Sequence, residues 1–236
     1  MTSKISCVVP ARNEGGHLFE LIEKIMRLEE ISDIVIVEGG SSDDTWQVAK
    51  SIAAIDSTRI SAIQQTGKGK FNAVIDGAEL CQESLVLIWD ADGTVPVTNT
   101  LEIIETALLN NCAVMGNRLV GSMEIGAMRK ANKIGNWLFA FLWAPILNWK
   151  PVDLLCGTKL FPKEVFISIP ESLLKADPYG DFALIANSIR LNYPLKSIPV
   201  DYTSRKYGET NIHRWSGGLR LLWVTAIVYS RRIQKI

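Results

Sequence analysis

The sequence has no excess of charge of either sign. Its 236 residues contain 25 lysines and arginines against 25 aspartates and glutamates, so the formal net charge is zero. A nucleic-acid-binding domain that relies on a broad basic face needs a clear excess of basic residues. We therefore expect no nucleic-acid partner.

Histidine and cysteine are also scarce. The two histidines, His17 and His213, show no paired metal-ligand spacing. The four cysteines lie far apart and form no C-x-x-C pair: Cys7, Cys81, Cys112 and Cys156. These absences argue against a zinc site and a disulfide framework, and we expect free thiols in a reducing compartment.

Long hydrophobic runs are missing as well. No uninterrupted apolar run reaches the roughly 18 residues of a membrane-spanning helix. The opening residues move directly into a strand pattern, so we expect no signal peptide. Apolar residues nevertheless make up 47% of the chain, which is enough for a substantial core in one large α/β domain.

The first half of the chain alternates strand and helix patterns. Apolar runs typical of buried strands lie at 5–9, 34–37, 59–63, 85–89 and 112–115, with amphipathic segments between them. This alternation predicts a mostly parallel, doubly wound sheet with helices on both faces. Ligands bind such sheets beyond the carboxyl ends of the strands, where polar and glycine-containing segments follow several of the predicted strands.

The second half is expected to be richer in helix. Helical patterns span 127–147, 181–191 and 215–233, and strands are expected within 153–161 and 196–202. We find no internal repeat, and we predict a single domain over 1–236.

Two carboxylates close the fourth predicted strand. The apolar run at 86–89 leads directly into Asp90-Ala91-Asp92. Residues i and i+2 share a side in extended backbone, so both acids can point to one place. Mg²⁺ often bridges carboxylates to substrate phosphates, which suggests a metal-held diphosphate. The alternative is a pair of solvated surface acids after a strand.

Several short motifs follow one another along the chain in an order that is typical of one protein family. They are VVPARNE, VEGGSSDDT, TGKGKFNAV, WDADG, MGNR, DLLCGTKLF, DPYGDFAL and IPVDYTSRKYGETNI. In this order they resemble the inverting family 2 glycosyltransferases with the GT-A fold. The chain is most similar to the polyprenyl-phosphate sugar transferases of the dolichyl-phosphate mannosyltransferase-like group. Each string alone is unspecific, but the resemblance covers nearly the whole chain.

The resemblance implies a donor site for a nucleoside-diphosphate sugar. It puts Pro10, Arg12 and Glu14 at the base and ribose; the alternative is a strand-ending proline and a solvated loop. Glu38 stands where the family usually has the first of two acids, and Gly39 replaces the second. That replacement puts the nucleobase contact in doubt, although Gly39 could equally be a turn glycine.

Further donor contacts are implied by basic segments. Gly67 and Lys68 would bring backbone and positive charge to the nucleotide, and Arg118 would face a phosphate. Arg205 and Lys206 lie in a loop that could close over the diphosphate or bind an acceptor phosphate. Solvent-exposed basic residues are the alternative for each of these positions.

The resemblance also implies which residues bind the metal and which carboxylate is the candidate base. Asp90 and Asp92 would hold Mg²⁺ or Mn²⁺, with Asp92 in the more direct contact. Asp181 would act as the base for a hydroxyl acceptor, or as a positioning group if the acceptor is an ionised phosphate. A helix-capping role is the alternative for Asp181, and Asp177 is a weaker candidate for the base. Asp153 and Gly157 resemble an acceptor-loop motif, and a turn between a helix and a strand is the alternative.

Two apolar segments in the second half of the chain contain tryptophan and are flanked by basic residues. They are 137–143 and 219–229, and such helices can lie in a membrane interface. Packing in the core or against a second subunit is the alternative, so a homo-oligomer is also considered.

These features together predict a metal-dependent inverting glycosyltransferase with a lipid-phosphate or other lipid-linked acceptor. Residues 1–118 would form the nucleotide-sugar-binding half, 119–211 the acceptor-side half, and 212–236 a C-terminal helix. We expect a cytoplasmic protein, peripheral at the cytoplasmic face of a membrane. A sugar nucleotidyltransferase and an inactive nucleotide-sugar-binding module remain alternatives.

Overall fold

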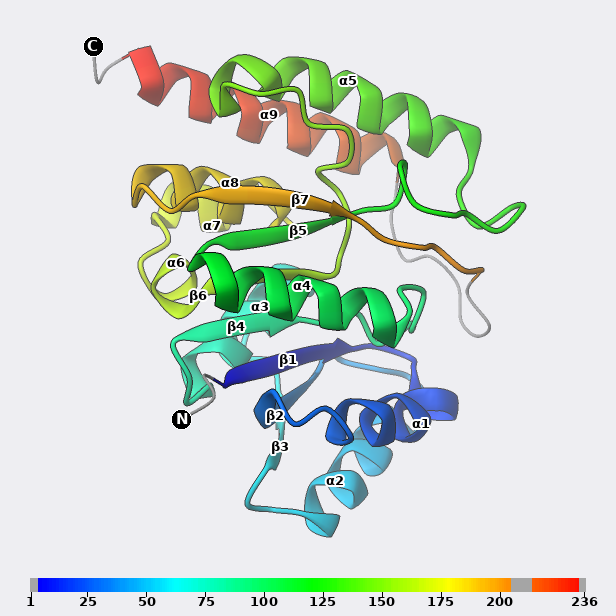
Figure 1. Ribbon diagram of the computed structural model, residues 1–236. Helices are drawn as coiled ribbons and strands as arrows, with labels where there is room; N and C mark the ends of the chain where they lie inside the picture. Colours follow the sequence, from blue (N-terminus) through cyan, green and yellow to red (C-terminus); the bar gives the residue numbers. More distant parts are fainter. Residues whose placement is uncertain (1–3, 205–213, 234–236) are drawn as a thin grey trace.

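The computed structural model describes residues 4–204 and 214–233, in which the strands form one sheet (Figure 1). The strands are β1 (Ile5–Ala11), β2 (Ile31–Glu38), β3 (Ile60–Gln64), β4 (Leu85–Ile88), β5 (Ala113–Asn117), β6 (Lys159–Pro162) and β7 (Leu195–Pro199). The helices are α1 (Gly15–Met26), α2 (Thr45–Ile55), α3 (Lys70–Leu80), α4 (Val97–Asn110), α5 (Lys130–Leu147), α6 (Lys163–Ile167), α7 (Glu171–Ala176), α8 (Asp181–Arg190) and α9 (Arg214–Ile233). The predicted alternation of strands and helices is confirmed.

The sheet has the order β3-β2-β1-β4-β6-β5-β7. Neighbouring strands are parallel except at β6, which runs antiparallel to both β4 and β5. The sheet is therefore mostly parallel, as predicted. Its register pairs Ala11 with Glu38 and Glu38 with Gln64, so β1, β2 and β3 end side by side. The loops that follow these strands consequently meet at one edge.

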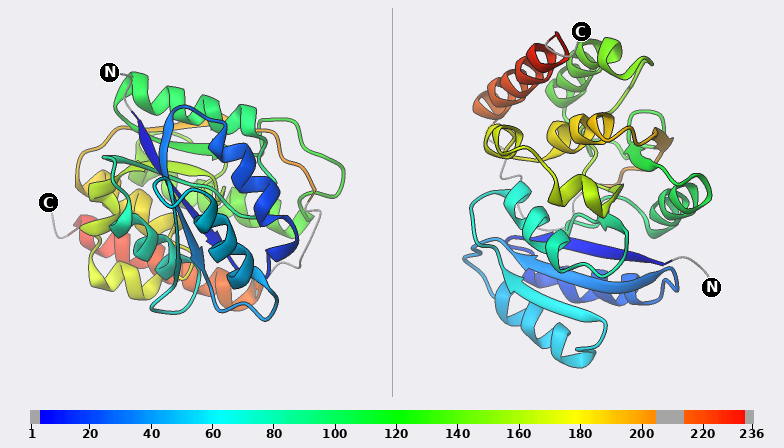
Figure 2. Two further views of the ribbon diagram at one scale, coloured as in Figure 1. Left: turned by 90° about the horizontal axis from the view of Figure 1, so that it is seen from below. Right: turned by 90° about the vertical axis from the view of Figure 1, so that its left-hand side faces the viewer.

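Helices cover both faces of the sheet (Figures 1 and 2). One face is buried by α1, α2 and α4, whose apolar stripes include Leu18, Ile52 and Ile103. The other is buried by α3 and by α6 to α8, with Phe71 and Phe182 among the fully buried side chains. The amphipathic segments predicted between the first five strands are confirmed as α1 to α4.

Helices α5 and α9 pack against each other and lie outside α8. Figure 2 shows them as an outer layer at the end of the molecule opposite α2. The Trp143 indole N–H donates to the Thr225 hydroxyl at 3.0 Å, and the Trp143 ring lies 4.7 Å from that of Phe182. Among the described residues, none of the helices combines the length and apolarity that crossing a membrane requires.

Two local features differ from the sequence expectation. β1 continues through Pro10 to Ala11, because its pairing with β4 stops at Val8 and the missing proline N–H interrupts no bond to that strand. Helices α6 and α7 were not predicted. With five and six residues, they are too short to display a helical period.

Candidate active site

Asp90 and Asp92 follow β4 at the edge where the parallel strands end. The Thr94 backbone N–H and hydroxyl donate to Asp92 Oδ1 at 3.1 and 2.9 Å, which fixes that carboxylate. Asp90 lies against the backbone of Gly157, where an added Cβ would lie 1.6 Å from Asp90 Oδ2. Because Gly157, in the predicted acceptor-loop motif, has no side chain, the Asp90 carboxylate has room to lie against its backbone.

Lys70, the first residue of α3, points at the same acids. Its Nζ lies 2.5 Å from Asp90 Oδ1. Burial lowers the pKa of Lys70, but the carboxylates of Asp90, Asp181 and Asp92 outweigh it and raise the pKa above its usual value. Lys70 therefore pairs with Asp90 and also feels the charges of Asp92 and Asp181, which come from two separate segments.

Asp181 enters this cluster from the start of α8. Its Oδ1 accepts a hydrogen bond of 2.6 Å from Lys159 Nζ, which also donates to the Leu154 carbonyl at 2.9 Å. Lys159 lies in β6 and is 1% exposed. The antiparallel entry of β6 between β4 and β5 therefore brings a buried cation to the acid that the sequence singled out.

Asp177, the weaker candidate for the base, has a structural role. Its two carboxylate oxygens accept four backbone N–H groups, those of Tyr179, Gly180, Phe182 and Ala183, at 2.9 to 3.0 Å. Burial and the nearby Asp181 raise its pKa, and these hydrogen bonds oppose the shift. Because Asp177 satisfies the start of α8, Asp181 is not needed as the cap.

The loops after β1 and β2 are joined by hydrogen bonds. Asn13, with a left-handed φ of 57°, accepts the Ser42 N–H at 2.8 Å and donates its own N–H to the Ser41 hydroxyl at 3.0 Å. Glu38 is buried and accepts from the Ser41 N–H at 2.5 Å and from Gln64 at 3.1 Å. Burial raises the pKa of Glu38, but these bonds bring it below its usual value.

Gly39 is not the residue that makes the turn after β2. The left-handed position is Gly40, with a φ of 73°. A Cβ at Gly39 would lie 3.4 Å from the Cβ of Arg12, which is exposed beside it. Pro10, Arg12 and Glu38 therefore lie at one strand edge, and their nucleotide contacts remain predictions.

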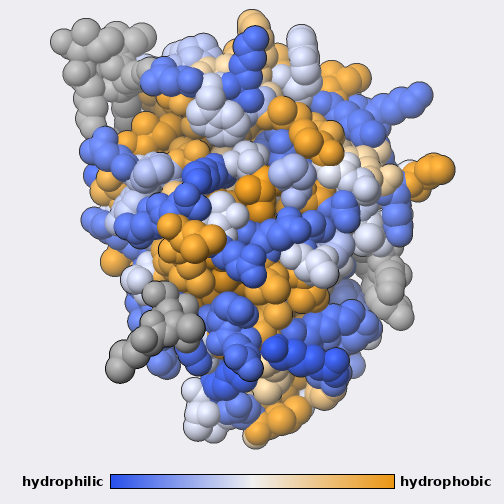
Figure 3. Space-filling view, viewed as in Figure 1, coloured by the Kyte–Doolittle hydropathy of each residue, from blue (hydrophilic) through white to orange (hydrophobic). Residues whose placement is uncertain are grey.

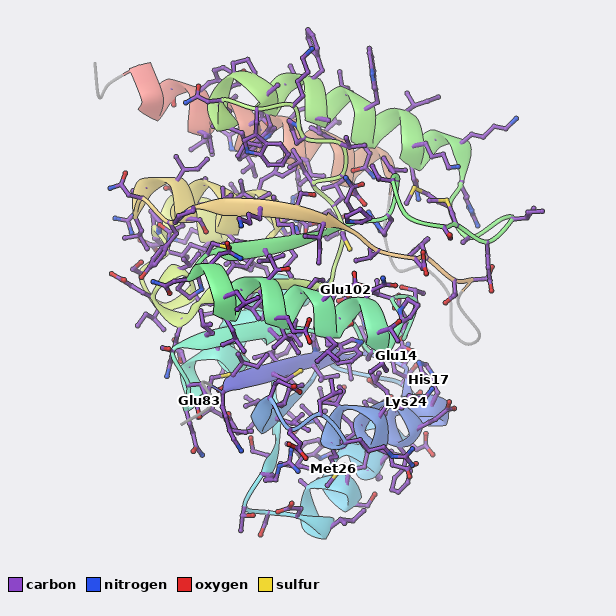
Figure 4. The ribbon with its side chains drawn as sticks, in the orientation of Figure 1. Glu14, His17, Lys24, Met26, Glu83 and Glu102 are labelled. Carbon is purple, nitrogen blue, oxygen red and sulfur yellow. The ribbon has the colours of Figure 1, made fainter. Side chains whose placement is uncertain are left out.

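Glu14 and His17 link α1 to the D-x-D loop. His17 Nε2 lies 2.8 Å from the Ala91 carbonyl and 2.9 Å from Glu14 Oε2, and both side chains are largely buried. Figure 4 shows the two residues together at the beginning of α1. From the sequence we inferred only that His17 has no paired metal-ligand spacing, and nothing in that spacing indicated the contact with Ala91.

Arg118 forms a buried ion pair. Its Nε and Nη2 donate to the Asp153 carboxylate at 2.7 and 3.0 Å, and its guanidinium lies 5.1 Å from the centre of the Tyr202 ring. Burial raises the pKa of Asp153, but Arg118 outweighs it and brings the pKa below its usual value. This pairing gives Arg118 a structural role, and its expected phosphate contact stays a prediction.

We expect Asp153→Asn to destabilise the fold by about 3–5 kcal/mol at pH 7, because it leaves Arg118 buried without its counter-ion. The Asp153 pKa is depressed on folding, so its stabilisation is present above the unfolded pKa and lost as the pH falls through the folded value. Denaturant unfolding should therefore show wild type and variant converging below about pH 4. An unchanged difference at low pH would contradict this assignment.

The remaining predicted donor contacts lie in two loops. Gly67 and Lys68 lie in the loop between β3 and α3; Lys68 is exposed, and its carbonyl accepts a hydrogen bond from the Asn72 side chain at 2.7 Å. Arg205 and Lys206 fall outside the described residues.

The structure adds Lys70 and Lys159 to the site. Lys70 was visible in the sequence only as the end of Gly67-Lys68-Gly69-Lys70 at a helix start. Lys159 is next to an apolar run in the sequence, and this position could have suggested a buried lysine that pairs with an acid. The sequence spacing does not show that the acid is Asp181, 22 residues further on.

The donor set at this edge fits a hard divalent cation whose coordination is completed by a substrate. Asp90 and Asp92 offer carboxylate oxygens, the ligand type that Mg²⁺ and Mn²⁺ prefer. Within the described ranges, no group of three or more His, Cys, Asp or Glu side chains is arranged to hold a metal. Mg²⁺ in particular is usually held by one or two carboxylates together with substrate phosphates.

Residues 6–169 match the family described as "Glycosyl transferase family 2". The chain belongs to this family. Glycosyltransferase AglJ of Haloferax volcanii is 26% identical over 211 residues, covering 88% of this chain and 66% of the relative. UDP-N-acetylglucosamine–dolichyl-phosphate N-acetylglucosaminyltransferase of Methanococcus voltae is 23% identical, covering 84% and 87%.

Solved structures extend the family 2 assignment to the fold. Glucosyl-3-phosphoglycerate synthase from Mycobacterium tuberculosis matches with a TM-score of 0.69 at 18% identity, covering 96% of this chain and 80% of that one. Mannosyl-3-phosphoglycerate synthase from Rubrobacter xylanophilus gives 0.69 at 19% identity, with 99% and 76% covered. The GT-A-like fold predicted from the motifs is thus confirmed.

Proposed function

We propose that this family 2 glycosyltransferase moves a sugar, with inversion, from a nucleoside-diphosphate sugar to a lipid-linked phosphate acceptor. The observation that carries the proposal is the convergence of Asp90, Asp92 and Asp181 around Lys70 at the carboxyl edge of the sheet. A diphosphate-metal site and a candidate base lie together there. Such a pairing is what one displacement at an anomeric carbon requires.

Asp90 and Asp92 would hold Mg²⁺ or Mn²⁺, which when bound supplies Lewis-acid neutralisation of the leaving diphosphate. Pro10, Arg12 and Glu38 would orient the nucleotide from the ends of β1 and β2. Asp181 would accept the proton of a hydroxyl acceptor; toward an ionised phosphate it would instead position the attacking group. Lys159 keeps the Asp181 carboxylate in one orientation through their 2.6 Å bond.

The acceptor class is supported by the names of the relatives. One is the dolichyl-phosphate N-acetylglucosaminyltransferase, and another is undecaprenyl-phosphate 4-deoxy-4-formamido-L-arabinose transferase of Proteus mirabilis, 28% identical over 88% of this chain. Solved structures with UDP and Mn²⁺ carry the same fold. These likenesses favour a metal–nucleotide donor and a polyprenyl phosphate acceptor for this chain.

The outer face of α5 and α9 supports a peripheral position at a membrane. Large apolar side chains are exposed on both helices: Ile134, Trp137, Leu138, Phe141, Leu219, Leu222 and Trp223. Figure 3 shows hydrophobic surface interspersed with hydrophilic side chains over α5. The two helices contain six basic and no acidic residues, although the whole chain is neutral. That combination suits an anionic lipid surface, at the cytoplasmic face in our proposal.

We expect Trp137→Ser/Phe141→Ser to weaken binding to phosphatidylglycerol vesicles about tenfold or more, because two exposed aromatic side chains lose their burial in lipid. Both residues are 68% exposed. The matched control is Phe19→Ser, which removes an exposed aromatic from α1. Co-sedimentation measures the effect. If the wild-type protein does not bind vesicles but forms a dimer that the double variant does not form, packing against a second subunit is favoured instead.

A donor screen tests the activity. Nucleotide-sugars are incubated with Mn²⁺ or Mg²⁺, with and without a polyprenyl phosphate, and nucleoside diphosphate release is measured, with Asp92→Ala as control. Release from one donor that the lipid stimulates and the variant loses supports the proposal. Pyrophosphate release would indicate a nucleotidyltransferase, and donor binding without turnover would indicate a binding module.

A further inference from the structure

Lys70 lies against Asp90, one of the two carboxylates proposed to hold the metal. Its backbone is held beside the turn that leads to Asp181, because the Phe71 N–H donates to the Pro178 carbonyl at 3.4 Å. Gly180, with a φ of 83°, has no room for a Cβ, which would lie 2.3 Å from the Phe71 ring. The start of α3 therefore packs tightly against the turn that leads to Asp181. Lys70 is placed by the fold and not by an adaptable surface loop.

The ammonium of Lys70 is paired with Asp90 Oδ1, an oxygen that the proposed metal would use as a ligand. Its Nζ is 2.5 Å from Asp90 Oδ1, and the two side chains are 33% and 28% exposed. Gly157 closes off the other oxygen, Oδ2, from its own side. A metal ion arriving alone must therefore compete with Lys70 for Asp90.

The charges of the cluster explain how a donor changes this competition. Asp90, Asp92 and Asp181 outnumber Lys70 and Lys159, and the nearby Asp177 adds to the negative side. Lys159 is occupied by Asp181 at 2.6 Å. A divalent cation offsets this negative excess and so removes the repulsion that a diphosphate would otherwise meet. The phosphate oxygens in turn offer Lys70 a new partner, since lysine is a common phosphate ligand.

We propose that Lys70 pairs with Asp90 in the donor-free protein and moves its ion pair to the diphosphate when metal and nucleotide bind together. Lys70 is then a donor-binding residue that also disfavours binding of metal alone. This inference rests on the proposed donor class. It assigns a role to a lysine for which the sequence alone suggested none.

Lys70→Met tests the inference through two binding constants that should change in opposite directions. Mn²⁺ binding without nucleotide, followed by electron paramagnetic resonance, should tighten at least severalfold because a competing charge is gone. Binding of UDP or GDP in saturating Mn²⁺, measured by calorimetry, should weaken about tenfold or more because a charge-assisted bond is lost. Lys70→Arg should restore nucleotide binding.

The matched control is Lys175→Met, which removes a lysine at the same 2.5 Å from a carboxylate but in an exposed pair with Glu171. Both constants should stay at their wild-type values in this control. Weakening of both constants in Lys70→Met would indicate a merely structural residue, and no change in either would show that Lys70 acts on neither ligand. Each result overturns the inference, as does tighter metal binding with unchanged nucleotide binding.

The two arms separate this inference from the proposed function. Wild-type protein that binds no nucleoside diphosphate in Mn²⁺, with ADP, CDP and dTDP tested beside UDP and GDP, would contradict the proposed donor class. The metal-only comparison needs no nucleotide, and unchanged Mn²⁺ binding in Lys70→Met would still overturn the role assigned to Lys70.

Discussion

Gly157→Ala should lower kcat/KM by about a hundredfold or more, because it displaces by about an ångström a carboxylate that we propose as a metal ligand. The new Cβ would lie 1.6 Å from Asp90 Oδ2 and 2.5 Å from its Cγ. Backbone and carboxylate cannot both stay, so Asp90 must leave its position or the loop before β6 must move. Mn²⁺ binding with nucleotide should weaken in parallel with activity.

The control for this change is Gly135→Ala in α5, where an added Cβ meets nothing within 4 Å. Replacing a helical glycine by alanine should leave activity unchanged and stabilise the fold by about 0.4–1 kcal/mol. Gly157→Ala protein that is folded and fully active would show that the position of Asp90 is not required for turnover.

Asp181→Asn should lower kcat by about a hundredfold or more, whether the residue takes a proton or orients the acceptor. The change should also destabilise the fold by about 2 kcal/mol or more, since Lys159 loses its carboxylate partner while 1% exposed. Steady-state kinetics and denaturant unfolding measure the two effects.

A second variant separates catalysis from stability. Asp181→Asn/Lys159→Met removes the unpaired buried cation as well, and most of the lost stability should return. Activity should not return, because the carboxylate is still missing. Recovery of both would mean that Asp181 only stabilises the fold, as a partner for Lys159.

The sequence was sufficient to predict that polar residues gather at the carboxyl edge of the sheet, because the motifs that indicate this are local. Asp90 and Asp92 stand two residues apart after a strand, and alternating patterns place that strand in a parallel sheet. The order of the short motifs then identified the family, and the match over residues 6–169 confirms it.

The contacts between distant segments could not be predicted in the same way. Lys159 reaches Asp181 because β6 enters the sheet antiparallel, a reversal that no local pattern shows. Likewise, the contact of His17 with Ala91 joins residues 74 positions apart. The space that Gly157 leaves for Asp90 depends on the packed loop and not on the glycine alone.

The most direct test of inverting transfer to a lipid phosphate uses a labelled sugar on the donor found in the donor screen. Transfer of the label to a polyprenyl phosphate is measured, and the anomeric configuration of the product is determined by NMR. The proposed function predicts label in the lipid phase, one nucleoside diphosphate released per sugar transferred, inverted configuration, and loss of all three in Asp92→Ala. A product with retained configuration, or label that leaves the donor without entering the lipid, would contradict it.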